Sequence, residues 1–284
     1  MTLLHFAKLH ATGNDFLVRL ALDDDTRPLA GQTAARLCDR HRGIGADGLI
    51  TIGSGDPRTG TDCTMTLQNA DGGEAEMSGN GIRCLAWVAV RAGLGTASEL
   101  VVETAAGRRA VALTRDASGD VIAAEVDMGP VTLGEEDVCI TVDGVEYWGD
   151  TASVGNPHLV CFVVDPDAVP VAGHGPRIEL DSRFPQRTNV EFVRVHPPDA
   201  MYMRVWERGV GETLSCGTGA CAAAAVAHSR GVADEQVRVR VPGGELEVTL
   251  GETVRLGGPV VHVFDADIDI DIDAAIDRRV EQTS

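Results

Sequence analysis

Two short segments place a small polar or nucleophilic side chain directly before Gly-x-Gly and an apolar run. Ser78 precedes Gly79-Asn80-Gly81, and Cys216 precedes Gly217-Thr218-Gly219. At a helix start, such a side chain lies beside backbone N–H groups without intrahelical acceptors, near the positive end of the helix dipole. That setting favours anions. We therefore expect the pKa of the Cys216 thiol to fall from about 8.5 towards neutrality and the N–H groups to hold a carboxylate. Cys216 is thus a candidate base or nucleophile, although a buried structural cysteine gives the same pattern.

The two segments belong to an internal repeat. Each copy reads Glu, three residues, Ser or Cys, Gly-x-Gly and then a helix, expected at 82–90 and at 220–228. A second motif, Gly13-Asn14, recurs as Gly155-Asn156 at nearly the same offset, which is about half the chain. Two unrelated motifs at one spacing favour a duplication and therefore two similar structural units.

Strand-like runs flank these motifs in both halves and would position them. The runs are 3–9, 16–20 and 63–67 in the first half, and 146–154, 159–164 and 201–205 in the second. Turn signals at Ala106-Gly107 and at 242–244 predict a hairpin after each helix. Many strands around one apolar helix predict an α+β fold rather than a doubly wound sheet.

We expect two domains with the active site in the cleft between them. The segment 116–120, Asp-Ala-Ser-Gly-Asp, breaks the strand pattern and sets domains of residues 1–118 and 119–264. The tail at 265–271 alternates acidic and apolar residues, which suits an edge strand or a solvated tail. We expect residues 265–284 to complete the first domain.

The composition excludes several classes of protein. A formal charge of −19 opposes binding to nucleic acid or to an anionic membrane surface. The chain has no apolar run long enough to span a membrane and no secretory signal at its start, so we expect a cytoplasmic protein. The seven cysteines include no Cys-x-x-Cys pair, which argues against a disulfide framework or a zinc ribbon.

The small number of lysines limits which cofactors the protein could use. Lys8 is the only lysine, so a pyridoxal phosphate enzyme would have to form its Schiff base there. Because Lys8 lies in an expected strand, an ordinary structural position, we expect neither pyridoxal phosphate nor a metal as cofactor.

Other polar residues suit an amino-acid ligand. The amides expected at loop or strand ends are those of Asn14, Asn69, Asn156 and Asn189. Arg208 has the planar fork that clamps a carboxylate, Glu207 suits an ammonium group, and His158 could orient a catalytic group. Each of these residues is also common in a purely structural role, as a turn residue, a cap or a surface ion pair.

Further motifs follow one another in order along nearly the whole chain. They are Lys8-x-His10-x-x-Gly13-Asn14-Asp15-Phe16, Arg42-Gly43-Ile44-Gly45-Ala46-Asp47-Gly48, Asn69-Ala70-Asp71-Gly72, Gly79-Asn80-Gly81-x-Arg83-Cys84, Gly155-Asn156-Pro157-His158, Asn189, Glu207-Arg208-Gly209-x-Gly211-Glu212-Thr213 and Cys216-Gly217-Thr218-Gly219-Ala220. Together they resemble the diaminopimelate epimerase family, isomerases that interconvert LL- and meso-2,6-diaminopimelate on the bacterial route to lysine and peptidoglycan.

The resemblance implies a fold, a mechanism and roles for the matching residues. It implies two pseudo-symmetric domains, each a curved, mostly antiparallel sheet around a central helix, usually in a homodimer. The mechanism is cofactor-free proton transfer between two bases, of which Cys216 is one. The residues implied to bind substrate are Asn14, Asn69, Gly79, Asn80, Asn156, Asn189, Glu207, Arg208, Gly217 and Thr218. His158 and Glu207 are implied to orient and polarise the reacting groups.

The sequence departs from the family at Ser78, where the second catalytic cysteine is expected. A serine hydroxyl is far less acidic than a thiol, yet it can donate a hydrogen bond or, less readily, a proton. Three explanations stay open: Ser78 is natural and supported by its surroundings, it is an engineered replacement, or it marks a changed reaction. The alternative functions are therefore a related amino-acid epimerase, a hydroxyproline-type dehydratase using a Ser/Cys pair, or an impaired variant that only binds substrate.

Overall fold

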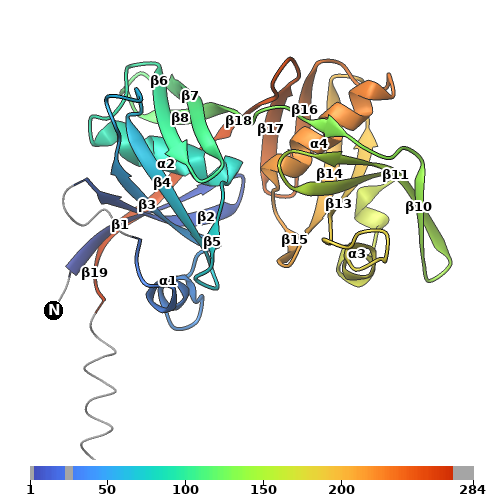
Figure 1. Ribbon diagram of the computed structural model, residues 1–284, viewed down its shortest axis with the longest axis horizontal. Helices are drawn as coiled ribbons and strands as arrows, with labels where there is room; N and C mark the ends of the chain where they lie inside the picture. The colour runs from blue at the N-terminus through green and yellow to red at the C-terminus, as the bar shows by residue number, and fades with distance from the viewer. Residues whose placement is uncertain (1–2, 23–27, 271–284) are drawn as a thin grey trace, which may run out of the picture.

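The computed structural model describes residues 3–22 and 28–270, and there the chain folds into two lobes. Figure 1 shows them side by side, the first lobe around α2 (Gly79–Arg91) and the second around α4 (Gly217–Ser229). Hydrogen bonds join 19 strands of the described residues into one continuous mixed sheet. The predicted α+β class, with strands wrapped around one central helix per lobe, is confirmed.

The elements of each lobe follow in chain order. The first lobe contains β1 (Leu3–Ala11), β2 (Asn14–Ala21), α1 (Gly31–Cys38), β3 (Gly48–Ser54), β4 (Cys63–Asn69), β5 (Glu74–Ala75), α2, β6 (Glu99–Thr104), β7 (Gly107–Arg115), β8 (Val121–Asp127) and β19 (Val261–Asp269). The second contains β9 (Thr132–Leu133), β10 (Val138–Val142), β11 (Val145–Ser153), β12 (Pro157–Phe162), the 3-10 turn η1 (Pro166–Ala168), α3 (Val171–Glu179), β13 (Asn189–Val195), β14 (Ala200–Glu207), β15 (Gly211–Thr213), α4, β16 (Gln236–Val241), β17 (Gly244–Thr249) and β18 (Arg255–Pro259).

The strand pairings repeat between the lobes, which confirms the predicted duplication. In the first lobe, β2 pairs in parallel with β3 across α1, and β4 pairs with both β5 and β6. In the second, β12 pairs in parallel with β13 across α3, and β14 pairs with both β15 and β16. The parallel units and their helices were not predicted, because α1 and α3 are short and contain residues of low helix propensity, such as Pro176 inside α3.

The chain crosses between the lobes twice. β8 pairs with β7 on one side and with β18 on the other, so a backbone ladder joins the lobes. β19 then returns to pair with β1, which makes residues 265–269 an edge strand of the first lobe. The segment 116–120, where the sequence suggests a domain boundary, forms the turn between β7 and β8, and the crossing comes after β8. Residues 271–284, also expected in the first domain, lie outside the described residues.

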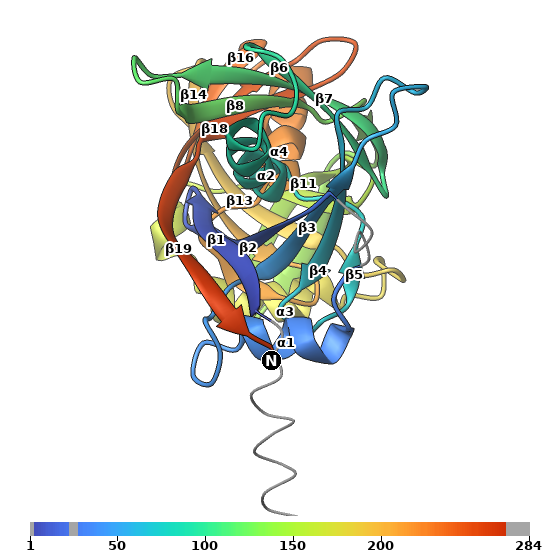
Figure 2. The ribbon, with the colours of Figure 1, turned by 90° about the vertical axis from the view of Figure 1, so that its left-hand side faces the viewer.

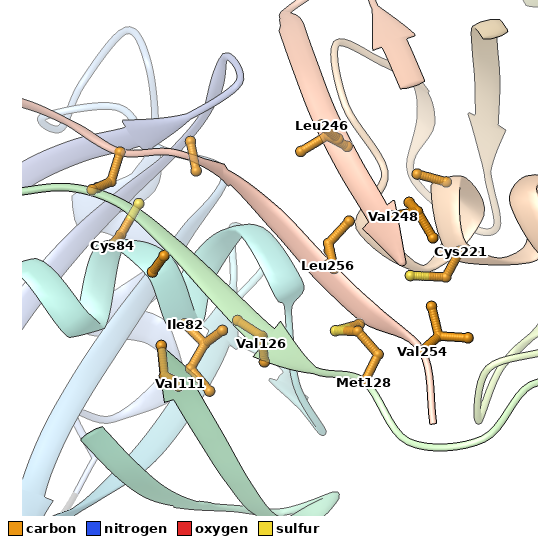
Figure 3. Packing of buried hydrophobic residues seen from close by; sticks show 14 of the residues in the cluster. Ile82, Cys84, Val111, Val126, Met128, Cys221, Leu246, Val248, Val254 and Leu256 are labelled. Carbon is orange, nitrogen blue, oxygen red and sulfur yellow. The ribbon is translucent and has the colours of Figure 1, made fainter. Parts of the chain in front are cut away.

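One apolar core runs through both lobes. Figure 3 shows Met128 and Leu256 at the crossing, with Ile82 of α2 on one side and Cys221 of α4 on the other. Seen at right angles to Figure 1, α2 lies in front of α4, and β8 and β18 pass above both helices (Figure 2). All the alanines of α4 except the half-buried Ala225 are buried, so the strands can close tightly around this helix.

Buried cysteines give the fold a specific dependence on pH. Burial raises the pKa of Cys63, Cys84 and Cys221 each to about 12, whereas unfolded thiols ionise near pH 8.5. Above that pH the unfolded state releases protons that the folded state keeps, so the free energy of unfolding falls as pH rises.

We therefore expect the stability advantage of the wild type over Cys63→Ala to shrink by about 2 kcal/mol between pH 7.5 and pH 10. Urea unfolding of both proteins across this range measures it. An advantage that stays constant with pH would contradict the expectation.

In the described part of the chain, no helix is long and apolar enough to cross a membrane.

Candidate active site

Ser78 and Cys216 hold equivalent positions at the starts of the two central helices. Ser78 is the N-cap of α2 and Cys216 is the N-cap of α4, both with extended backbones (φ −133°, ψ 124° and φ −122°, ψ 113°). The Ser78 hydroxyl accepts from the N–H of Gly81 at 3.1 Å, and the Cys216 sulfur accepts from the N–H of Gly219 at 3.4 Å. The repeated motif thus builds the same cap twice.

The first residues of the two helices lie close to each other. A Cβ built on Gly217 would lie 3.6 Å from the Cα of Gly79, and a Cβ on either glycine would lie within 2.7 Å of the Cδ2 of Leu256. A side chain at either position would force the fully buried Leu256 to move, which glycine avoids. The sequence separates the two motifs by half the chain, and the fold brings them together.

Four backbone donors remain at this meeting point. Within residues 3–22 and 28–270, no acceptor is found for the N–H groups of Gly79, Asn80, Gly217 and Thr218. The first N–H groups of a helix have no intrahelical acceptor and favour anions. These donors match a carboxylate held between the two helix starts.

Side-chain amides tie the first helix start to the second lobe. Asn80 donates from Nδ2 to the Oδ1 of Asn14 and to the backbone oxygen of Ser215, both at 3.1 Å. Thr12 donates to the Ser215 hydroxyl at 2.7 Å. The turn between β1 and β2 and the residue before Cys216 are therefore held in one network.

A charged cluster fixes Asn14 from its other side. Asn14 donates from Nδ2 to Asp47 at 2.7 Å, and Arg40 bridges Asp47 and Asp15. Lys8 donates to Asp15 and to the backbone oxygen of Gly45. The single lysine of the chain is thus part of an ion pair next to the site.

In the second lobe, a buried histidine links the α4 start to an acid. Asn156 donates to the Thr218 hydroxyl at 3.3 Å, and its Oδ1 lies 3.0 Å from the Nε2 of His158. The Nδ1 of His158 lies 2.7 Å from the Oε1 of Glu191, and both side chains are fully buried. Both ring nitrogens face oxygen atoms, which fixes the orientation of the imidazole.

Glu191 belongs to the candidate site, although no sequence motif points to it. It lies on β13 between the buried residues Val190 and Phe192, and a Cβ built on Gly219 would lie 2.6 Å from its Oε1. The sequence does contain a signal for it, because Glu191 stands inside an apolar strand and a buried acid needs a partner.

We expect Glu191→Gln to lower turnover about 10- to 100-fold, because it replaces a charge-assisted hydrogen bond of about 1.5–3 kcal/mol to His158. Steady-state kinetics of the folded variant measures the effect. Glu146→Gln, at an exposed acid on β11, is the control. Equal turnover of Glu191→Gln and wild type would exclude a role for Glu191 in orienting His158.

The expected lowering of the Cys216 pKa at the helix start is wrong for this structure. Cys216 is only 4% exposed, and its pKa is raised well above the usual value by burial and then by the nearby acids Glu207 and Glu191. Hydrogen bonds from Thr218 and from the N–H of Gly219 oppose the rise without cancelling it. Desolvation and two acids therefore outweigh the helix start.

Glu207 contacts the same sulfur. Burial raises the pKa of Glu207, while hydrogen bonds from Thr213 and Cys216 act in the opposite direction. An ammonium group placed beside Glu207 would offset its negative charge and so lower the pKa of Cys216.

The remaining predicted residues lie further out. Asn189 is buried beside His158, donates to the backbone oxygen of Pro157 at 2.8 Å and accepts from the N–H of Arg208 at 2.9 Å. The Arg208 guanidinium is exposed and donates to a backbone oxygen, that of Gln186. Asn69 is exposed at the end of β4, and in the described residues no hydrogen bond joins its side chain to another predicted site residue.

Two cavities lie away from this site. One of about 780 Å³ is lined by residues such as Phe162, Val193 and Arg230, and another of about 360 Å³ lies beside Tyr202 and Arg240. Neither includes Ser78 or Cys216, so the predicted cleft stays a prediction. Among the described residues, no group of three or more His, Cys, Asp or Glu side chains is placed to hold a metal ion.

Several known proteins with similar sequences are diaminopimelate epimerases. The family model for diaminopimelate epimerase matches residues 6–134 and 151–262. The diaminopimelate epimerase of Synechococcus elongatus is 43% identical over 285 residues, covering 94% of this chain and 99% of that protein. The one from Heliobacterium modesticaldum is 40% identical over 278 residues, covering 92% and 98%.

Solved structures with low sequence identity share the fold. A probable proline racemase from Agrobacterium radiobacter superposes with a TM-score of 0.74 at 17% identity, covering 94% of this chain and 93% of that one. A hydroxyproline epimerase from Agrobacterium vitis gives a TM-score of 0.71 at 16% identity, covering 94% and 92%. From the family model and the sequence relatives, which span nearly its whole length, this chain belongs to the diaminopimelate epimerase family.

Proposed function

We propose that the protein interconverts LL- and meso-2,6-diaminopimelate by moving the proton of one α-carbon between two opposed side chains, without a cofactor. The observation that carries this proposal is the meeting of two equivalent helix starts, capped by Ser78 and Cys216. An α-carbon whose carboxylate binds between these helix starts would have one capping side chain on each face.

The site offers partners for each group of an amino acid. The free N–H groups of Gly79, Asn80, Gly217 and Thr218 would hold the reacting carboxylate. Glu207 would take the α-ammonium, and Arg208 would take the carboxylate at the far end of the substrate. Asn14, Asn69, Asn156 and Asn189 complete the proposed binding residues, with His158 orienting Asn156.

Proton transfer would use the charge that develops on the carboxylate. Removal of the α-proton by the Cys216 thiolate breaks the C–H bond, forms S–H and moves the electron pair towards the carboxylate as an enediolate. The N–H groups of both helices face that oxygen charge and stabilise it. The Ser78 hydroxyl gives its proton to the other face, which completes inversion and leaves an alkoxide that takes a proton from solvent. In the reverse reaction the Cys216 thiol donates the proton.

The raised pKa of Cys216 sets the order of events. Without substrate the sulfur is a thiol, so it is ready to donate a proton but not to accept one. The substrate ammonium would offset the charges of Glu207 and Glu191 and make the thiolate accessible. Binding and activation of the base are thus coupled.

Exchange with solvent tests the proposal. We expect diaminopimelate, supplied as the LL form or as the meso form, to gain deuterium at one α-carbon when it is incubated with the reduced protein in deuterated water, as followed by mass spectrometry and NMR. Screening hydroxyproline and other free amino acids in parallel tests the related epimerase and the dehydratase. Calorimetric binding of diaminopimelate without any exchange would instead indicate a protein that only binds its substrate.

The same proposal includes the organisation of the protein. We propose two domains with the site between them, a homodimer and a cytoplasmic location. Light scattering after gel filtration measures the oligomeric state. A mass of one chain would exclude the homodimer.

A further inference from the structure

Arg83 is a fully buried arginine directly behind the proposed carboxylate site. It lies in the first turns of α2 and is 0% exposed. Its guanidinium donates to the Oδ1 of Asn80 at 2.8 Å and to the backbone oxygen of Gly79 at 3.2 Å. A third contact reaches the Thr12 hydroxyl at 3.5 Å. Arg83 therefore contacts the two α2 residues whose N–H groups would hold the substrate.

The charge of Arg83 has no carboxylate partner in residues 3–22 and 28–270. Its Nε is buried without any hydrogen-bond partner there, and its contacts are amide, hydroxyl and backbone oxygens. Burial lowers the pKa of Arg83 to about 10, so the group is still positive at neutral pH. A buried, unpaired charge is strongly unfavourable, which suggests that an anion completes the site.

Arg83 also fixes the orientation of two site amides. Asn80 accepts from Arg83 with its oxygen and donates from its nitrogen to Asn14, which in turn donates to Asp47. A cation at one end and a carboxylate at the other allow only one orientation of each amide. Loss of the cation would remove the constraint on Asn80.

We propose that Arg83 is a positioning residue whose buried positive charge, acting through Asn80 and the α2 start, stabilises the substrate carboxylate and more strongly the enediolate formed from it. This inference rests on the proposed function. In the low-dielectric interior a fixed charge acts across one residue without touching the substrate, and it gains most where negative charge accumulates.

Three variants in the wild-type and Ser78→Cys backgrounds test the inference. Arg83→Met removes the charge, Arg83→Gln keeps hydrogen-bonding capacity without charge, and Arg83→Lys keeps a charge. Arg19→Met, at a second buried arginine on β2, is the control for the loss of a buried arginine. Melting temperature, calorimetric Kd for LL-diaminopimelate and the rate of deuterium exchange are measured for each folded protein.

We expect Arg83→Met and Arg83→Gln to raise Kd about tenfold and to slow exchange about 100-fold, a larger effect on rate than on binding. At pH 7, Arg83→Lys recovers part of the lost affinity and part of the lost exchange rate. Towards pH 9.5 it loses this recovery, because a buried lysine releases its proton more readily than arginine. Arg19→Met changes the melting temperature and leaves Kd and exchange within threefold of its parent.

Two results distinguish failure of the Arg83 inference from failure of the proposed function. If the parents bind and exchange while folded Arg83→Gln or Arg83→Lys matches them at both pH values, Arg83 has only a structural role and the inference is wrong. If neither parent binds or exchanges diaminopimelate, the proposed function fails and the inference fails with it. The Arg83→Lys pH dependence still decides the case if Arg83→Met does not fold.

Discussion

Cys216→Ala is expected to reduce deuterium exchange at the α-carbon about 10²- to 10⁴-fold, the range that a positioned acid or base contributes. The variant keeps the helix start and the N–H groups of α4, so substrate should still bind. The measurements are the exchange rate in deuterated water and the calorimetric Kd. A lost rate at a nearly unchanged Kd is the expected result, because the thiol acts on the proton rather than on the carboxylate.

Cys221→Ala is the matched control for this experiment. Cys221 lies on the same helix, is fully buried and does not cap it. Its replacement makes the same chemical change at similar burial, so any loss of stability is comparable while exchange should persist. Equal exchange by Cys216→Ala and Cys221→Ala would show that Cys216 is a core residue rather than a base.

Ser78→Cys is expected to raise the rate of full epimerisation by about 10²-fold or more, since a thiol ionises near pH 8.5 and a serine hydroxyl does not ionise in the accessible range. Ser78 already occupies the N-cap geometry that Cys216 occupies in α4, so the substitution needs no new backbone conformation. Circular dichroism of diaminopimelate solutions, or separation of the LL and meso forms, measures the interconversion.

The Ser78 protein itself gives a sharper form of this prediction. With Cys216 as the only efficient base, one stereoisomer presents its α-proton to the sulfur and should exchange with solvent faster than it inverts. The other stereoisomer presents its proton to Ser78 and should exchange slowly. Ser78→Cys should equalise the two. Ser118→Cys, in the exposed turn after β7, controls for adding a thiol. An unchanged rate in Ser78→Cys would show that the serine is adequate.

Much of the site was predictable because its parts are local. The caps at Ser78 and Cys216 follow from a polar residue, two glycines and an apolar run, a local pattern that favours a helix start. The duplication was visible for the same reason, as two motifs at one offset. The short helices α1 and α3 were missed because their composition does not favour helix over loop.

The two helix starts, the candidate base and the polar residues around them can be inferred from the linear sequence, because each depends on neighbours a few residues apart. The packing of distant segments establishes that β8 and β18 join the lobes, that Glu191 meets His158, and that Arg83 lies buried without a carboxylate partner in the described residues. It also reversed the expected pKa shift of Cys216. Burial and the approach of distant charges arise when separate segments pack together, and no local pattern encodes them.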